Sequence, residues 1–188
     1  MSTPVPDILS TLIANIIPEN DVLRLAALQK LEILYTPSEN AFDKITSMIA
    51  RVFDTPMAFL SLVDKDTVYY KSQVGTFGKS QVDRKDSFCS LAILSKEPLV
   101  ITDTSLSGCF NTNPLVQEEN GIKFYAGAPL ITKDGFHIGA LCIVDNKPKQ
   151  FSNKDIALLT EFANMAMNEI EARHKLFQQV LLHERSTE

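Results

Sequence analysis

Two segments of the sequence are apolar at almost every position, and this pattern most restricts the possible folds. Residues 57–63 contain one polar residue, Ser61, and residues 136–144 are nearly as apolar. Because successive side chains of a strand point to opposite faces, such strands must be covered on both faces. Asp64-Lys65-Asp66 and Asp134-Gly135 are typical turn sequences, so neighbouring strands are expected to be antiparallel. The sequence therefore predicts an α+β fold with helices on both faces of an antiparallel sheet.

The rest of the chain supplies the covering elements. Apolar residues recur with helical spacing before Pro18, Pro37 and Pro56, and each proline marks a break. Residues 103–120 are rich in Ser, Thr, Asn and Gly, which predicts a long ordered loop or helical turns. The predicted helices cover residues 5–17, 20–34, 39–53 and 87–96, and the predicted strands cover 57–63, 67–74, 99–102, 123–131 and 136–144.

The longest predicted element is a helix from Ser152 to the end of the chain, a stretch without Gly or Pro. Its apolar residues lie three and four positions apart, as in a coiled coil, with Arg173 as the one exception. Thirty helical residues span ~45 Å, whereas a compact domain of this size has a radius of gyration of only ~16 Å. The helix is therefore expected to extend beyond the domain and to pair with another helix. The alternative is a helix that frays near Lys175.

Composition and charge narrow the classes of function. The 188 residues fit one domain with helical extensions, and a formal charge of −5 without a basic block disfavours nucleic acid as a partner. No apolar run approaches the ~20 residues that span a bilayer, and no basic residue precedes Arg24, so neither a membrane segment nor a signal peptide is predicted. The three cysteines, Cys89, Cys109 and Cys142, form no C-x-x-C pair. This argues against a zinc site or a disulfide framework and for a cytoplasmic location.

Several separated motifs resemble those of a GAF domain. The chain reads FYAGAPL at 124–130 and GALCIVD at 139–145, like the closing strands of that fold. Four earlier motifs stand in the expected order, namely SLVD at 61–64, KS at 71–72, SFC at 87–89 and NPLV at 113–116. Together they are similar to the bacterial sensory GAF domains found ahead of histidine kinase or diguanylate cyclase modules, over about residues 20–175.

The resemblance implies a six-stranded antiparallel sheet with helices on both faces. The terminal helices would pack together on one face, and a small-molecule pocket would lie beneath the shorter helices and the long loop on the other. The chain would then divide into an N-terminal amphipathic helix over 1–18, a GAF domain over 19–175 and a C-terminal helical extension over 176–188. GAF domains commonly dimerise through their terminal helices, and their ligands vary widely.

The sequence departs from these relatives at three places. Relatives usually read Asp-Pro-Arg-Phe where this chain has Ser107-Gly108-Cys109-Phe110, so it lacks an arginine that would hold an anionic ligand. Arg84-Lys85 stands where Arg-Asp is usual, and Ser90 rather than His follows Cys89. The signature of cyclic-nucleotide GAF domains is also absent. Cyclic nucleotide and covalently attached bilin are therefore both disfavoured.

Aromatic residues on the strands and on the 87–96 segment would form the walls of the pocket. Ser61 would add a polar contact, and Asp103 would either accept a hydrogen bond from a ligand or cap the turn that follows it. The alternative for the aromatic residues is plain core packing, since pockets and cores are similar in sequence. The candidate ligand-binding residues are Phe59, Ser61, Tyr70, Phe88, Cys89, Asp103, Phe110 and Tyr125.

The cysteines have separate expected roles. Cys89 is either a reactive thiol at a helix N-terminus or a small buried apolar residue. Cys142 lies in an apolar strand and is expected to pack in the core. Cys109 lies in the loop and is expected to be the most exposed. Cys89 and Cys109 could form a redox pair only if their Cα atoms lie within about 7 Å.

The sequence favours a non-catalytic sensory module that binds an unidentified small molecule and signals through its terminal helices. No hydrolase, P-loop or metalloprotease motif occurs, and the three histidines have no metal-ligand spacing, so no catalytic residue, metal or cofactor is predicted. One alternative is a cysteine-dependent enzyme that reduces free methionine sulfoxide; another is a ligand-free dimerisation module for a separate signalling partner. The predicted homodimer interface includes Ile8, Leu12, Ile170 and Phe177.

Overall fold

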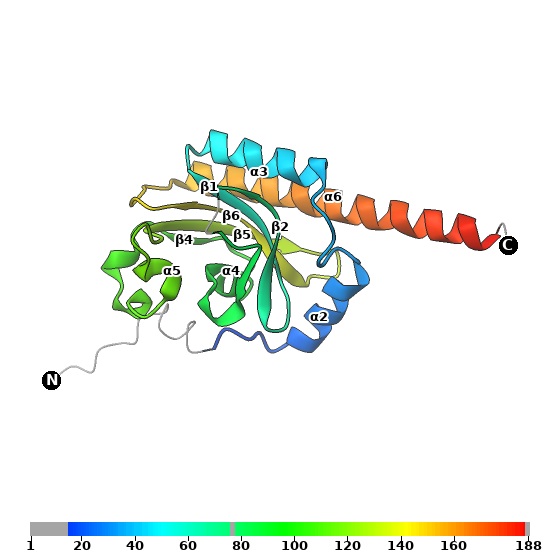
Figure 1. The fold of residues 1–188 in the computed structure, drawn as a ribbon, viewed down its shortest axis with the longest axis horizontal. Helices are drawn as coiled ribbons and strands as arrows, with labels where there is room; N and C mark the ends of the chain where they lie inside the picture. The colour runs from blue at the N-terminus through cyan, green and yellow to red at the C-terminus, as the bar shows by residue number, and fades with distance from the viewer. Residues whose placement is uncertain (1–14, 76–77, 187–188) are drawn as a thin grey trace.

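The computed structural model describes residues 15–75 and 78–186, and its centre is one six-stranded antiparallel sheet (Figure 1). The strands lie in the order β3-β2-β1-β6-β5-β4. All seven residues of β1 are buried, as expected for a strand that is covered on both faces. The predicted fold class is therefore confirmed. The strands are β1 (Met57–Val63), β2 (Thr67–Val74), β3 (Gln81–Asp83), β4 (Leu99–Ile101), β5 (Phe124–Ile131) and β6 (His137–Asp145).

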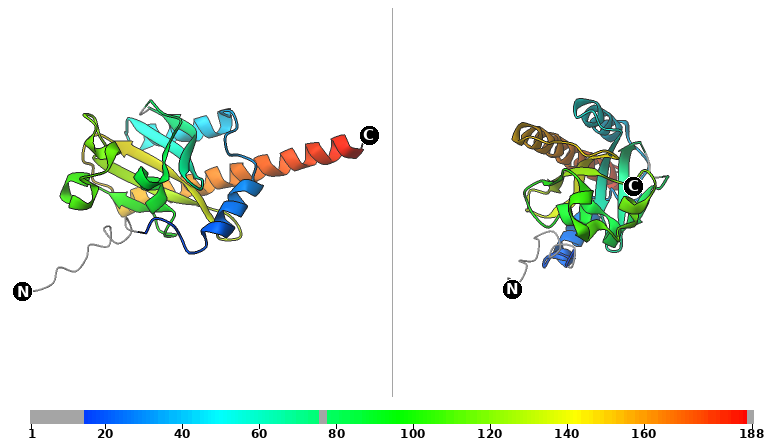
Figure 2. Two further views of the ribbon diagram at one scale, coloured as in Figure 1. Left: turned by 60° about the horizontal axis from the view of Figure 1, so that its bottom comes forward. Right: turned by 90° about the vertical axis from the view of Figure 1, so that its left-hand side faces the viewer.

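Helices cover both faces of this sheet. On one face α3 (Asn40–Val52) and α6 (Asn153–Ser186) lie side by side, as the end-on view in Figure 2 shows. On the other face lie the short helices α4 (Phe88–Ala92) and α5 (Pro114–Gln117). The helix α2 (Asp21–Lys30) lies at one end of the sheet. Each face buries its own hydrophobic cluster, so the sheet separates two cores.

The helix α6 extends beyond the domain, as the sequence predicts (Figure 1). It has 34 residues, which corresponds to about 51 Å at the usual helical rise. Its first half packs into the core, with Leu159, Ala163 and Ile170 at most 1% exposed. It continues past Lys175 to Ser186, so the alternative of an end near Lys175 is wrong.

Other predicted boundaries need correction. Of the helix predicted over 5–17, residues 5–14 lie outside the described residues, and 15–17 are not helical. The helix predicted over 20–34 ends at Lys30, because the chain turns at Glu32 and Tyr35, whose φ angles are 50° and 57°. The region 103–120 contains short helical turns, η2 (Thr104–Leu106) and η3 (Gly108–Phe110), followed by α5.

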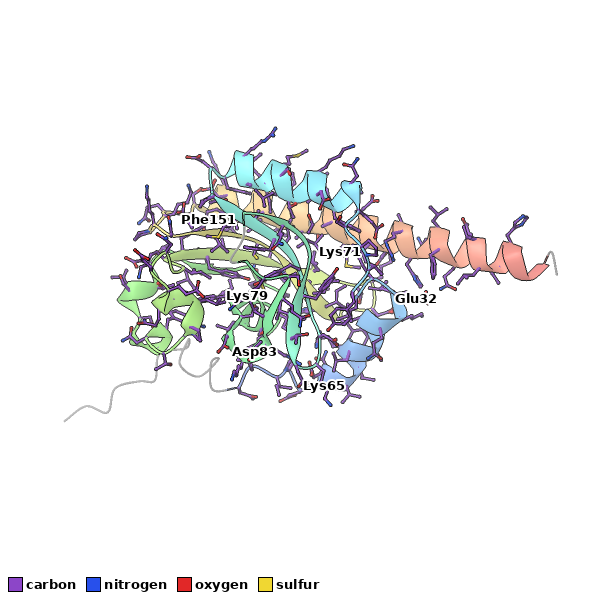
Figure 3. All side chains as sticks on the ribbon, in the orientation of Figure 1. Glu32, Lys65, Lys71, Lys79, Asp83 and Phe151 are labelled. Carbon is purple, nitrogen blue, oxygen red and sulfur yellow. The ribbon has the colours of Figure 1, made fainter. Side chains whose placement is uncertain are left out.

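A buried ion network connects β2, α3 and α6. The Lys71 side chain is 0% exposed, and its Nζ donates to Glu39 Oε1 at 2.6 Å and to Thr36 Oγ1 at 2.8 Å. Arg173 Nε donates to the same Glu39 carboxylate at 2.7 and 3.0 Å. Arg173 Nη1 also donates to the Glu32 carbonyl oxygen. Lys71 and Glu32 lie near the end of the sheet where α2, α3 and α6 converge (Figure 3). Arg173 interrupts the apolar spacing of α6 because it contacts this network.

A second ion cluster fixes α2 against the sheet. The Asp21 carboxylate accepts from Arg24 Nε at 2.8 Å and from Arg84 at 2.7 and 2.9 Å. Both arginines are buried, and Arg24 Nη1 also donates to the Val63 carbonyl oxygen at 2.6 Å. Since removing one partner of a buried ion pair leaves an uncompensated charge, Asp21 is needed to keep these arginines buried.

Candidate functional site

The candidate site lies between the sheet and the short helices, on the face opposite α3 and α6. Seven of the eight predicted ligand-binding residues meet there. Phe59 and Ser61 come from β1, Tyr70 from β2, Phe88 and Cys89 from α4, Phe110 from η3 and Tyr125 from β5, and all seven are buried.

Side chains fill most of this site. The remaining central cavity has a volume of about 20 Å³ and is bordered by Phe59, Tyr70, Phe88, Cys89 and Tyr125, together with several apolar residues and Cys142. The ring of Phe88 stacks on Tyr125 at a centroid distance of 5.3 Å and contacts Phe110 at 5.1 Å. Because a single water needs roughly 10–15 Å³, the central cavity holds about one water-sized molecule in this conformation. A larger ligand requires movement of the covering side chains.

Two thiols form the polar centre of the site. Cys89 Sγ lies 3.7 Å from Cys142 Sγ and donates to Ser61 Oγ at 3.3 Å. The Tyr125 hydroxyl donates to Cys89 Sγ at 3.4 Å. The hydrogen bond with Cys142, helped by those of Ser61 and Tyr125, lowers the pKa of the Cys89 thiol, whereas burial raises the pKa of Cys142. The two thiols, the Ser61 hydroxyl and the Tyr125 hydroxyl therefore form one hydrogen-bonded cluster.

Local structure holds both thiols in place. Ser87 caps α4 by accepting from the Cys89 backbone N–H at 3.2 Å, and all five residues of α4 are buried. Cys142 lies in the middle of β6, opposite Phe59 on β1 and Gly127 on β5. A Cβ atom at Gly127 would lie 2.2 Å from the Tyr125 hydroxyl oxygen, so glycine makes room for the group that contacts Cys89.

The structure shows a cysteine contact that the sequence does not predict. Cys142 packs in the core, as expected, and its sulfur lies beside that of Cys89. Cys109 is half-buried and borders a separate cavity of about 90 Å³, on the outer side of Phe88 and Phe110. The alternation of side chains along a strand could have placed Cys142 in the site, because Phe59, Ser61 and Cys142 lie on the same face of the sheet once β1 and β6 are paired.

Asp103 lies apart from the central cavity. Its carboxylate accepts from the Ser105 hydroxyl at 2.6 Å and from the Ser105 backbone N–H at 2.9 Å. These hydrogen bonds lower the pKa of Asp103. Of the two roles that the sequence left open, the structure shows the cap of a turn.

The predicted dimer residues differ in their surroundings. Ile8 and Leu12 lie outside the described residues. Ile170 is 0% exposed in the core of the protomer, so it is not available to a partner chain, whereas Phe177 is 41% exposed. Within residues 15–75 and 78–186, no group of three or more His, Cys, Asp or Glu side chains could hold a metal ion, and no helix is long and apolar enough to cross a membrane.

Comparison with known proteins identifies the family. The GAF domain family model matches residues 37–170, and the chain therefore belongs to the GAF domain family. It is 36% identical over 154 residues to the cyclic di-GMP phosphodiesterase PA2567 of Pseudomonas aeruginosa, a match that covers 81% of this chain. The chain spans about a quarter of the length of that relative, 26%. It is thus a GAF domain related to signalling proteins.

Solved structures share the fold at low sequence identity. The GAF domain of a phosphoenolpyruvate-protein phosphotransferase from Coxiella burnetii has a TM-score of 0.61 and 20% identity, covering 87% of this chain and 97% of that one. The free methionine-R-sulfoxide reductase from Neisseria meningitidis has a TM-score of 0.60 and 16% identity, covering 94% and 98%. The same fold therefore occurs in the GAF domain of a phosphotransferase and in a free methionine-R-sulfoxide reductase, so the fold alone does not decide the function.

Proposed function

We propose that this GAF domain is a non-catalytic sensory module that forms a homodimer through α6 and transmits the state of the central cavity to that helix. The observation that carries the proposal is the divided burial of α6. Up to Ile170 most of its apolar residues pack in the core, with Leu158 and Met165 the exceptions at 37% and 53% exposed. Beyond Arg173 it exposes Leu176, Phe177 and Val180, which are 64%, 41% and 47% exposed. An apolar stripe on an extended helix is typical of a helix that pairs with another helix.

The sensing step involves a small molecule that enters beneath Phe88 and Phe110. The central cavity is smaller than a metabolite, so binding requires the region 103–120 to move outward. A ligand shifts the arrangement of α6 only if it binds two conformations with different affinity. Opening of the site supplies two such conformations.

The dimer is tested by charge substitution on α6. Glutamates at Phe177 and Val180 place two buried charges in the proposed interface, so Phe177→Glu/Val180→Glu should be monomeric by sedimentation at concentrations where the parent chain is a dimer. Gln179→Glu, at an exposed neighbouring position, is the matched control and should remain dimeric. A parent chain that is monomeric at high concentration contradicts the proposal, as does a dimer that both variants retain.

The ligand is sought by thermal shift with a metabolite collection. A ligand at about 100 times its Kd adds ~2.7 kcal/mol of stability. Phe110→Ala is the useful companion variant, because it removes the ring that packs against Phe88 at the border of the central cavity and should change the affinity of a true ligand. If no compound shifts the melting temperature of either protein, the dimerisation module for a separate partner replaces the ligand sensor.

Reduction of free methionine sulfoxide is the second candidate, because two thiols meet in the site. The central cavity does not accommodate methionine sulfoxide unless the cover opens, which favours the first candidate. The enzyme candidate predicts turnover in the parent chain and none in Cys89→Ser. Absence of turnover in the parent chain eliminates it.

A further inference from the structure

We propose that Cys89 and Cys142 are an oxidation site, at which hydrogen peroxide converts the two buried thiols into an intramolecular disulfide. The inference depends on neither the dimer nor the small-molecule ligand proposed above. It concerns covalent chemistry at two side chains whose positions the structure gives directly.

The geometry needs little change for the bond to form. The sulfur atoms are 3.7 Å apart, and a disulfide needs ~2.05 Å, so they must approach by about 1.7 Å. Both cysteines are free thiols, and α4 packs directly on β6. Rotation about the Cα–Cβ bond of either residue moves its sulfur over such a distance.

The reaction has two balanced steps. In the first, the Cys89 thiolate attacks one oxygen of hydrogen peroxide, an S–O bond forms, the O–O bond breaks, and the leaving hydroxide takes up the thiol proton as water. In the second, the Cys142 sulfur attacks the sulfur of the Cys89 sulfenic acid, the S–S bond forms, and a second water leaves. The two thiols lose two electrons and two protons in total, and the peroxide is reduced to two waters.

The surroundings assign these roles to the two residues. Hydrogen bonds with Cys142, Ser61 and Tyr125 lower the pKa of Cys89, which favours the thiolate that attacks peroxide. The Tyr125 hydroxyl donates to Cys89 Sγ at 3.4 Å and stabilises a negative charge on that sulfur, so Cys89 is the attacking residue and Cys142 is the resolving residue.

The size of the site selects the oxidant. The central cavity of about 20 Å³ borders both Cys89 and Cys142, and the ring of Phe88, packed against Phe110 and Tyr125, borders both this cavity and the outer cavity of about 90 Å³. Hydrogen peroxide has two heavy atoms and is close to water in size, whereas tert-butyl hydroperoxide has a bulky carbon group that close-packed rings exclude. We expect hydrogen peroxide to oxidise Cys89 at least about tenfold faster than tert-butyl hydroperoxide does.

Peptide mapping of the full chain tests the proposal. Trypsin places Cys89, Cys109 and Cys142 in separate peptides, 86–96, 97–123 and 134–149. The reduced chain is treated with each peroxide, free thiols are alkylated, and the digest is analysed by mass spectrometry without reductant. The expected product links 86–96 to 134–149, with a loss of about two mass units relative to the two thiol peptides.

Two variants test the separate steps of the reaction, and a folding measurement accompanies them. Cys109→Ser is the matched control and should form the same linked peptide at the same rate. Cys142→Ser should stop at a sulfenic acid on Cys89 that dimedone traps, and its circular dichroism spectrum reports whether it folds. A link from Cys89 to Cys109, or full alkylation of Cys89 and Cys142 after Cys109 has been oxidised, overturns the proposal. Because these results come from the parent chain, they stand even if Cys142→Ser does not fold.

Discussion

Replacement of Glu39 by Gln tests whether the ion network holds α3 and α6 together. The carboxylate accepts from Lys71 at 2.6 Å and from Arg173 at 2.7 Å; the Lys71 side chain is 0% exposed and that of Glu39 is 37% exposed. Gln keeps the shape and removes the charge, which leaves the buried Lys71 ammonium with neutral acceptors only, among them Thr36 Oγ1 and the Pro37 carbonyl oxygen. Breaking a buried pair costs about 3–5 kcal/mol and an exposed pair about 0–1 kcal/mol, so an intermediate loss of about 2 kcal/mol is expected for this half-exposed site.

The loss should depend on pH with a defined sign. Partial burial raises the pKa of Glu39, but the hydrogen bonds and charges of Lys71 and Arg173 outweigh it and lower the pKa overall. A carboxylate with a lowered pKa in the folded state stabilises the fold above its unfolded pKa of about 4.3, and this stabilisation disappears as the pH falls through the folded pKa. The difference between parent and Glu39→Gln should therefore be complete at pH 7 and shrink below about pH 4.3.

Urea unfolding measures this difference in the free energy of unfolding, and thermal unfolding measures the matching change in Tm. At pH 7 a loss of about 2 kcal/mol corresponds to a decrease in Tm of about 4–8 °C for a chain of this length. Glu119→Gln, at an exposed position, is the control and should change stability by less than about 0.5 kcal/mol. The reasoning is refuted if Glu39→Gln matches this control at pH 7, or if its loss is the same at low pH.

Three further substitutions have defined outcomes. Gly139→Ala should cost more than about 3 kcal/mol of stability, because its Cβ would lie 2.0 Å from a backbone oxygen of β1. Gly108→Ala is the control: its Cβ would meet no atom closer than 3.7 Å, so its thermal melt should be nearly unchanged. Asp21→Asn should lose about 2–4 kcal/mol of stability at pH 7, because two buried arginines lose their counter-charge. These arginines lower the pKa of Asp21 against the effect of burial. The loss should therefore diminish in unfolding curves recorded below about pH 4. Tyr125→Phe removes a hydroxyl that donates to Cys89, so it should cost about 1 kcal/mol and slow the formation of the linked Cys89–Cys142 peptide in peroxide-treated protein. An unchanged rate would mean that this hydrogen bond does not activate the thiol.

The sheet could be predicted because its signal is local. Strands that are apolar on both faces, the Asp134-Gly135 turn and the spacing along α6 are properties of neighbouring residues. The end of α2 could not be predicted in this way. Its apolar spacing continues to Leu34, but the helix ends at Lys30, and the Tyr35 hydroxyl that follows donates to Asp64 and contacts Thr67. Those partners lie about thirty residues away, so tertiary contacts determine this boundary.

The sequence predicts which residues form the candidate site, but it does not predict whether their side chains leave a pocket open. Aromatic residues on strands and on α4 were expected to meet, and six-stranded pairing brings them together. Whether they enclose a pocket or fill it depends on rotamers and packing, which alternation along a strand does not specify. The contact between Cys89 and Cys142 depends on the register of β6 against β1, where Cys142 lies opposite Phe59, and on the cap that fixes α4.

A β-bulge in β2 connects the two faces of the sheet. Leu60 pairs with Ser72 and Ser61 pairs with Tyr70, which leaves Lys71 as the extra residue. Tyr70 lies beside the central cavity, whereas Lys71 binds Glu39 and the Ser72 hydroxyl donates to Asp43 on α3 at 2.6 Å.

Regular alternation would direct Ser72 to the same face as Tyr70, so the bulge is what brings Lys71 and Ser72 together on the α3 side. A displacement of Tyr70 acts on Lys71 through one peptide unit, and Lys71 shares Glu39 with Arg173 of α6. One covalent and ionic connection from the thiol site to α6 therefore runs through this bulge. Since Glu39→Gln weakens this connection outside the central cavity, Cys89 and Cys142 should keep their reaction with peroxide in that variant, as measured by the linked peptide.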